Sequence, residues 1–220
     1  MNFFQQHPLP AAATFAQLLP PLVVMLAWSR MTSARRYIAL WCLAFFVSDL
    51  VQLRVSSLFG FNLWIFIYLE PFEDALLLWA LSYWQTRPIT RITLRIATPL
   101  FIASYVGLAF AAGEQDTFKT FSGPFRALII MGWTAFTLVS NVARTPERVW
   151  SRDWLWTTLG VLLYFGLLVV TEPIIAAMPR DQIASMMRVY DVRSIGDVFA
   201  FILIWRGMRC PLPSNSSGST

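Results

Sequence analysis

The chain has 220 residues, of which 57 % are hydrophobic and 13 % are charged, with a formal net charge of +5. Soluble domains carry about 25 % charged residues, so the composition argues against a soluble enzyme. Repeated apolar runs near 20 residues are typical of a polytopic membrane protein. All but one of the 17 basic residues are arginine, which we interpret as a bacterial coding bias. No soluble basic face is left for a nucleic-acid partner.

We expect an all-α bundle of seven transmembrane helices over residues 1–208, followed by a short disordered cytoplasmic tail at 209–220. The start, MNFFQQHPLP, has no basic n-region, so it does not resemble a cleavable signal peptide. The continuous apolar part of the seventh span is short, so a bundle of six spans is the alternative. The predicted spans are Ala11–Trp28, Tyr37–Gly60, Phe61–Trp84, Ile96–Ala112, Phe125–Val142, Trp154–Met178 and Val189–Gly207.

Arginines in the loops predict the orientation. Eleven basic residues fall on one side of the seven spans and five on the other. Because positive residues accumulate in cytoplasmic loops, we expect the N-terminus outside and the C-terminus inside a bacterial inner membrane. The eleven are Arg30, Arg35, Arg36, Arg87, Arg91, Arg95, Arg144, Arg148, Arg152, Arg206 and Arg209; the five are Lys119, Arg126, Arg180, Arg188 and Arg193.

Charged residues also fall inside four predicted spans. A charge at the bilayer centre costs about 2.5–3.5 kcal/mol on insertion scales, so these side chains are expected to face one another or a cavity. Asp191 is placed at the outer surface, and the others form the predicted ligand-binding set. That set comprises Asp49, Arg54, Glu70, Glu73, Asp74, Glu172, Arg193 and Asp197.

The spacing of these charges supports a shared cavity. Glu70, Glu73 and Asp74 are three and four residues apart, so they share one helix face. Acids outnumber arginines, and the excess favours binding of a proton, a metal cation or an organic amine. Arg54 is expected to be a structural counter-ion of an acid. The alternative for the whole cluster is a set of hydrogen bonds and ion pairs that only hold the bundle together.

Two prolines each follow a glutamate. Pro71 follows Glu70, and Pro173 follows Glu172. A proline inside a helix frees the carbonyl four residues earlier, and kinked helices form cation sites in many transporters. An ordinary kink without function is the alternative, because membrane helices tolerate proline.

The sequence lacks the residues that several classes of membrane protein and enzyme need for their chemistry. Lys119 is the only lysine and falls in a charged loop, which excludes a retinal pigment. His7 is the only histidine, and Cys42 and Cys210 have no metal-ligand spacing, so no metal or cofactor is expected. No G-x-S-x-G motif is present for a serine hydrolase.

Short motifs resemble two families of membrane enzymes. Tyr190-Asp191 and Gly196-Asp197 resemble the YD and GD elements of intramembrane aspartyl proteases, although both lie on one helix here and Ser194 replaces a glycine of that family. Phe46-Val47-Ser48-Asp49 and Gly196-Asp197 resemble aspartate motifs of bacterial lysoplasmalogenases, in reverse chain order. The proline-glutamine signature of small seven-helix sugar transporters is absent. No family role is transferred to these residues.

The sequence favours an outward-facing acidic cavity that binds or transports a small cationic or polar solute, with proton coupling as a further expectation. Glu70 and Asp74 are the expected central acids. One alternative is a non-catalytic sensor or assembly subunit with a membrane-protein partner. The other is an intramembrane lipid hydrolase in which Asp49 and Asp197 share one proton. A catalytic role is therefore left open.

Overall fold

The structure, a computed structural model, describes residues 8–59, 64–114, 119–144, 149–179 and 182–211. The described residues are helical without any strand, which confirms the predicted all-α class. Short 3-10 turns cover Trp28–Arg30 and Val149–Ser151. The α-helices are α2 (Pro8–Ala16), α3 (Leu19–Leu26), α4 (Ser33–Phe59), α5 (Trp64–Tyr83), α6 (Pro88–Ala111), α7 (Ser122–Val142), α8 (Asp153–Ala177) and α9 (Ile183–Met208).

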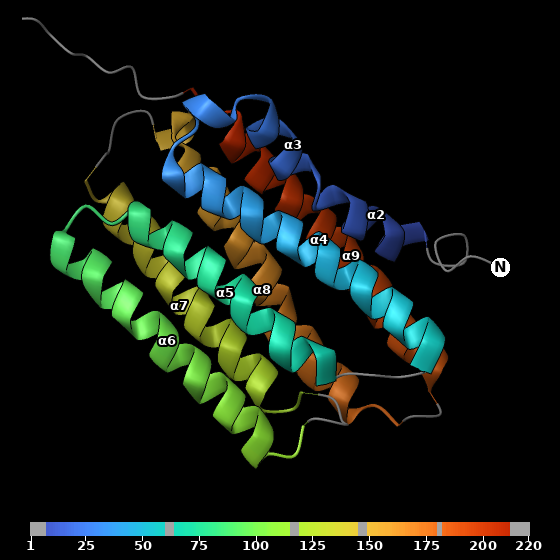
Figure 1. Ribbon diagram of the computed structural model, residues 1–220. Helices are drawn as coiled ribbons and strands as arrows, with labels where there is room; N and C mark the ends of the chain where they lie inside the picture. Colours follow the sequence, from blue (N-terminus) through green and yellow to red (C-terminus); the bar gives the residue numbers. More distant parts are fainter. Residues whose placement is uncertain (1–7, 60–63, 115–118, 145–148, 180–181, 212–220) are drawn as a thin grey trace, which may run out of the picture.

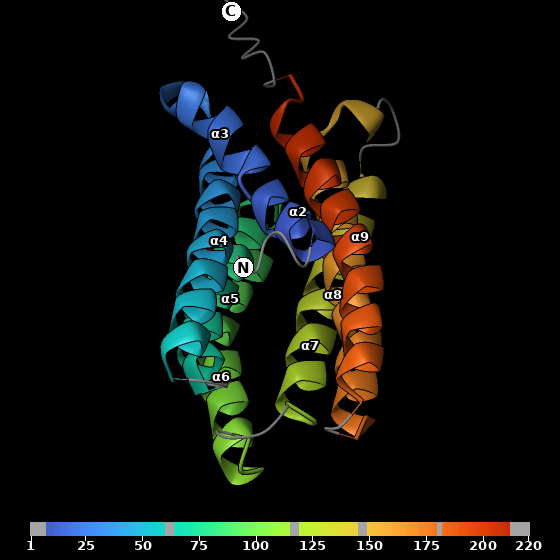
Figure 2. The ribbon, with the colours of Figure 1, turned by 90° about the vertical axis from the view of Figure 1, so that its right-hand side faces the viewer.

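Six long helices, α4 to α9, lie side by side and alternate in direction (Figure 1). In Figure 2, α4, α5 and α6 form one side of the bundle, and α7, α8 and α9 form the other. The short helices α2 and α3 cross obliquely in front of both sides, with α2 packed mainly on α9 and α3 on α4 and α9. The N-terminal segment therefore connects the two halves of the bundle.

Five segments are long and apolar enough to cross a membrane, which indicates a multi-pass membrane protein. The remaining long helices, α5 and α9, carry three and five charged residues, respectively. The five candidate spans are Pro8–Leu26, Ser33–Val55, Pro88–Ala111, Ser122–Val142 and Asp153–Ala177.

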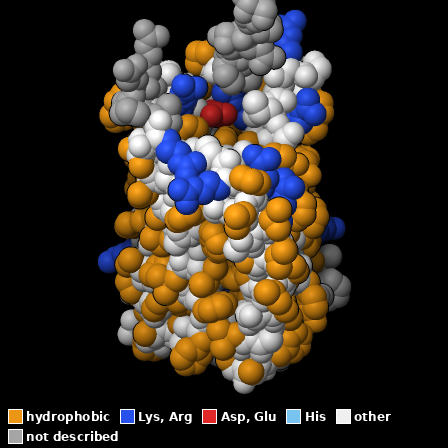
Figure 3. Space-filling view, turned by 90° about the vertical axis from the view of Figure 1, so that its left-hand side faces the viewer, with side chains coloured by type: hydrophobic (Ala, Val, Ile, Leu, Met, Phe, Trp, Pro, Cys, Tyr) orange, Lys and Arg blue, Asp and Glu red, His pale blue; other side chains and the backbone are white. Residues whose placement is uncertain are grey.

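The outer surface also fits a membrane. Leu26, Leu100, Val139, Val170 and Val192 are each more than half exposed, and apolar side chains cover most of the flank in Figure 3. Lys and Arg side chains gather instead near one end of that view. A soluble bundle would place its polar residues on such a flank, so the pattern agrees with lipid contact.

Arginines at the C-terminal end of the bundle lie over aromatic rings. The guanidinium of Arg206 is 4.0 Å from the ring centre of Trp156, and that of Arg95 is 5.0 Å from Trp79. Arg209 lies over Trp205 at 4.8 Å. The ring face attracts the guanidinium cation, so these pairs stabilise arginine side chains at a membrane surface.

The helix boundaries differ from the sequence prediction in two places. The first predicted span is broken into α2 and α3, because Pro20 and Pro21 lack the N–H groups that would continue the preceding helix. The fourth begins at Pro88 rather than Ile96, so Arg91 and Arg95 are helical rather than in a loop. Arg91 donates to the backbone oxygen of Gln85, and Arg95 donates to Ser82.

The other differences are small or lie outside the described residues. The seventh segment begins at Ile183, six residues before the predicted Val189. Residues 60–63, where the second and third predicted spans meet, are not described, and neither are His7, Arg148 and Arg180. Residues 212–220 of the predicted disordered tail also lie outside the described part.

Candidate functional site

A cavity of about 300 Å³ lies between the two halves of the bundle, lined by residues of α2, α4, α5, α7, α8 and α9. Glu70 and Arg126 lie in the second turns of α5 and α7, and Glu172 lies near the end of α8. The cavity is therefore nearer the end opposite the arginine-rich one. Its charged lining residues are Asp49, Glu70, Glu73, Glu172 and Asp197, with Lys119, Arg126 and Arg193.

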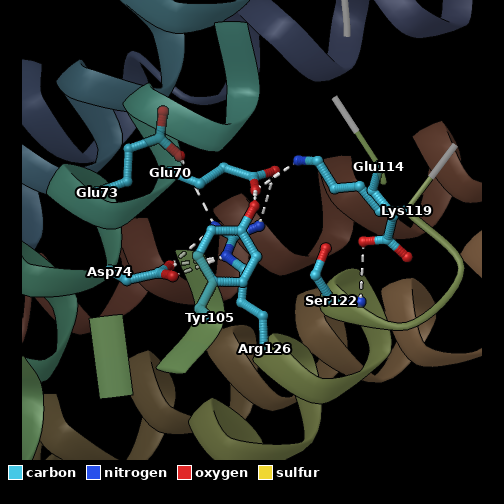
Figure 4. A network of polar contacts seen from close by, with 8 residues as sticks. All are labelled: Glu70, Glu73, Asp74, Tyr105, Glu114, Lys119, Ser122 and Arg126. Carbon is cyan, nitrogen blue, oxygen red and sulfur yellow. Dashed lines mark hydrogen bonds and ion pairs between the residues drawn. The ribbon is translucent and has the colours of Figure 1, made fainter. Parts of the chain in front are cut away.

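Arg126 of α7 binds three acids of α5 (Figure 4). Its Nε lies 3.0 and 2.8 Å from the two carboxylate oxygens of Asp74, and Nη2 lies 2.8 Å from Oδ1. Nη1 lies 3.0 Å from Oε1 of Glu70, and Nη2 lies 3.8 Å from Oε2 of Glu73. The forked guanidinium suits such multiple contacts, so Arg126 neutralises much of the α5 charge.

Glu70 has two further partners. The Lys119 Nζ lies 2.5 Å from its Oε2, and the hydroxyl of Tyr105 on α6 donates to the same oxygen. Figure 4 shows these side chains converging on Glu70 from three directions. The network thus ties α5, α6 and α7 together, and Glu70 and Asp74 are engaged mainly with the protein itself.

Glu114, three residues after the end of α6, caps the start of α7. Its Oε1 accepts the backbone N–H of Phe121 at 2.6 Å, and its Oε2 accepts that of Ser122 at 3.2 Å. Helix N-termini carry unpaired N–H groups and partial positive charge, so a carboxylate stabilises them. This cap holds the first turn of α7 where Arg126 reaches the α5 acids.

A second group of acids lies on α4, α8 and α9. Thr14 of α2 and Gln17, in the turn after α2, hold Asp49, donating to its Oδ2 at 3.2 and 2.7 Å. On α9, Nε of Arg193 lies 3.5 Å from Oδ2 of Asp197, one helical turn away. Asp49, Glu172 and Asp197 thus share the cavity with a single α9 cation, Arg193.

Four side-chain atoms of these acids and their neighbours Gln17 and Arg193 are buried without a hydrogen-bond partner in the described structure. They are Oε1 of Gln17, Oε2 of Glu172, Nε of Arg193 and Oδ1 of Asp197. A buried polar atom without a partner is costly, and native structures contain few of them. Their presence in one cavity is a chemical reason to expect a ligand there.

Gly123 makes room for Glu172. A Cβ atom at position 123 would overlap the Glu172 carboxylate. The Glu172 side chain can therefore reach the cavity only because the first turn of α7 carries a glycine at this point.

The structure brings six of the eight predicted residues to one cavity: Asp49, Glu70, Glu73, Glu172, Arg193 and Asp197. Asp74 is fully buried behind the wall against Arg126, and Arg54 lies exposed on α4. Pro71 and Pro173 lie within α5 and α8, which continue as helices beyond them. Neither proline therefore ends its helix.

Sequence reasoning missed the basic and polar partners. The loop pattern assigns Arg126 and Lys119 to the outer side, and no charge pattern points to Thr14, Gln17 or Tyr105. The sequence does contain a signal that Arg126 is buried, because it falls on the same helical face as other buried residues of α7. It lies four, eight and eleven residues before Ile130, Thr134 and Thr137, all of which are buried on the same side of α7.

Fold and site together define an all-helical, multi-pass membrane protein with a charged internal cavity. Compared with models of protein families, with curated protein sequences and with solved structures, the chain matches none of them. The function is therefore argued from the cavity alone.

Proposed function

We propose that the protein crosses a bacterial inner membrane seven times, with its N-terminus outside, and that its cavity binds and carries a small cationic or polar solute. In this proposal α2 with α3 forms the first span, and α5 and α9 also cross. The acids of α5, and Arg193 and Asp197 of α9, point into the bundle, where an ion pair or a cavity replaces contact with lipid. Arg188 and Arg206 lie exposed toward the two ends of α9. The concentration of arginine at the C-terminal end supports the orientation.

The observation that carries the proposal is the unequal charge of the cavity. Five carboxylates line it beside three cations, and one of these cations, Arg126, is already bound to Asp74 behind the wall. A cationic solute would balance the excess. A volume of about 300 Å³ is at the lower end of the range for small-molecule sites. Transport would then couple to protons, because a proton can replace the solute on a carboxylate.

Thermal unfolding of the purified protein tests solute binding. We expect one member of a panel of inorganic cations, amines and neutral polar solutes to stabilise the native chain, by about 2.7 kcal/mol at a hundredfold excess over its Kd. Asp197→Asn should lose this response. Asp191→Asn, on the same helix but outside the cavity lining, should keep it. A response retained in Asp197→Asn would contradict the proposal.

Proton coupling is tested in proteoliposomes that contain a pH-sensitive dye. Addition of the stabilising solute should change the internal pH with native protein and not with Asp197→Asn. Solute uptake without any pH change would support transport and contradict proton coupling.

A second candidate is an intramembrane hydrolase. Asp49 and Asp197 line the same cavity from different helices, an arrangement that lets two carboxylates act as acid and base. Lipid turnover that is lost in both Asp49→Asn and Asp197→Asn, without solute flux, would favour this candidate.

A further inference from the structure

Three oxygen atoms at the cavity need hydrogen-bond donors. Gln17 and Asp197 are 5 % and 9 % exposed, and each has one oxygen without a partner among the described residues, as has Glu172. The amide of Gln17 turns its NH₂ group toward Asp49, which leaves its carbonyl oxygen to another donor. A ligand that fits these atoms must donate hydrogen bonds rather than accept them.

The charge of the same region sets the sign of the ligand. Asp49, Asp197 and Glu172 line it beside Arg193, whereas the other two lining cations, Lys119 and Arg126, are paired with Glu70. A group that both donates hydrogen bonds and carries positive charge is a protonated amine. A neutral hydroxyl would supply the donor without the charge, and a quaternary ammonium would supply the charge without the donor.

Aromatic rings form the wall next to these acids. Phe45 and Tyr164 line the cavity and meet edge to face, with ring centres 5.3 Å apart. Behind them lie Trp41, Phe165 and Phe201. The Arg193 guanidinium is 6.0 Å from the ring centre of Tyr164, so this ring face already accepts a cation. An apolar or aromatic body would suit the same wall.

Arg193 is held far less tightly than Arg126. Its Nε makes a 3.5 Å ion pair with Asp197 and no hydrogen bond, whereas Arg126 makes three hydrogen bonds to Asp74 at 2.8–3.0 Å. Displacing Arg193 from Asp197 would therefore break one long contact. Arg193 occupies the place at Asp197 and Tyr164 that an external cation would take.

We propose that the ligand is a primary or secondary organic amine with an apolar body, whose ammonium group binds between Asp49, Asp197 and Gln17 and displaces Arg193 from Asp197. This inference rests on the proposed solute-binding function and specifies its ligand. The N–H groups bind the unpartnered oxygens, and the apolar body lies against Phe45 and Tyr164.

Three matched probes test the ligand class on the native protein by isothermal titration calorimetry. Benzylamine supplies charge and N–H donors, benzyltrimethylammonium supplies charge alone, and benzyl alcohol supplies a donor alone. We expect the Kd of benzylamine to be at least tenfold lower than that of either other probe. Equal affinity for benzylamine and benzyltrimethylammonium would overturn the inference, and this comparison needs no variant.

Variants then test the place of binding. Gln17→Leu and Asp197→Asn should each raise the Kd of benzylamine about tenfold or more, whereas Arg193→Gln should lower it, because the competing cation is gone. Asp191→Asn and Arg188→Gln are the matched controls on α9 and should leave it unchanged. An unchanged Kd in Asp197→Asn, or weaker binding in Arg193→Gln, would contradict the proposed placement.

The failure of this inference can be distinguished from failure of the proposed function. If potassium, magnesium or a neutral polar solute binds native protein and not Asp197→Asn, while benzylamine does not bind, the amine assignment is wrong and the solute-binding function stands. If no solute binds at all, both are wrong.

Discussion

At the scale of single residues, the buried acids of this protein fall into two kinds. Asp74 has both oxygens bound by Arg126, whereas Asp197 keeps one oxygen without a hydrogen bond. Removing one partner of a buried ion pair leaves an uncompensated charge, which is more costly than exchanging both partners. The first kind should therefore control stability, and the second should control binding.

Arg126→Met tests this distinction. The variant leaves Asp74 and Glu70 without the guanidinium that binds them, and the free energy of unfolding should fall by about 3–5 kcal/mol. Denaturant unfolding in detergent measures the loss. Arg54→Met is the control, because Arg54 is exposed on a long helix, and its effect should stay within about 1 kcal/mol.

The double variant Arg126→Met with Asp74→Asn gives a second test of the same contact. Because the uncompensated charge of Asp74 is removed, part of the stability lost in Arg126→Met should return. An Arg126→Met protein as stable as the native one would show that these hydrogen bonds contribute little.

The sequence could reveal the acids of the site but not their partners. An acid inside an apolar run is conspicuous because lipid cannot solvate it. Arg126 lies one turn from a helix end, where an arginine is as readily assigned to a loop. Whether Glu70 pairs with Arg54 or with Arg126 depends on the rotation of the helices, and composition does not determine that rotation.

At the scale of helices, the all-α class and the presence of several long apolar segments were predictable, and their packing was not. The period and length of the apolar runs predict each helix, and Pro20 and Pro21 provide a visible signal for the break between α2 and α3. The close contact of α8 with α9 depends instead on single glycines. Gly160 faces the backbone of Ala200, and Gly207 faces that of Asp153.

Gly160→Ala should separate these two helices. A Cβ atom at position 160 would lie 2.5 Å from the carbonyl oxygen of Ala200 and 2.6 Å from a side-chain carbon of Ile204. Because the first of these atoms belongs to the backbone, α9 must shift as a whole, and we expect a loss of about 1–3 kcal/mol. Thermal unfolding in detergent measures the change.

Gly132→Ala is the matched control for the contact between α8 and α9. A Cβ atom at Gly132 of α7 meets nothing within 4 Å, so this substitution should be neutral or raise stability by up to about 1 kcal/mol through the helix propensity of alanine. Equal effects of the two substitutions would mean that the close approach of α8 and α9 contributes nothing.

At the scale of the whole molecule, charge and aromatic residues divide the bundle into two ends. One end carries arginines over tryptophan rings, and the cavity with its acids lies toward the other. The loop charges predicted this polarity from the sequence alone. The crossing of α2 over both halves was not predictable, because it depends on contacts such as that of Thr14 with Asp49.

The two cysteines allow the orientation to be measured. Cys42 is fully buried, and Cys210 lies half-buried at the arginine-rich end, two residues after α9. A membrane-impermeant maleimide should therefore leave intact cells unlabelled and label Cys210 in inside-out vesicles. Cys210→Ser should remove the signal. Labelling of Cys210 in intact cells would place the C-terminus outside and reverse the proposed orientation.

The pH dependence of this labelling tests the local structure around Cys210. Partial burial, and then the nearby Asp153 carboxylate, raise the pKa of the Cys210 thiol above its ordinary value, although Arg35 and Arg206 oppose the shift. Because the thiolate is the reactive form, labelling should be slow at neutral pH and rise about tenfold per pH unit until that raised pKa is reached. Asp153→Asn removes the carboxylate and should speed labelling at neutral pH. A rate that levels off near the pKa of a free cysteine would show that Cys210 does not lie against the ends of α8 and α9.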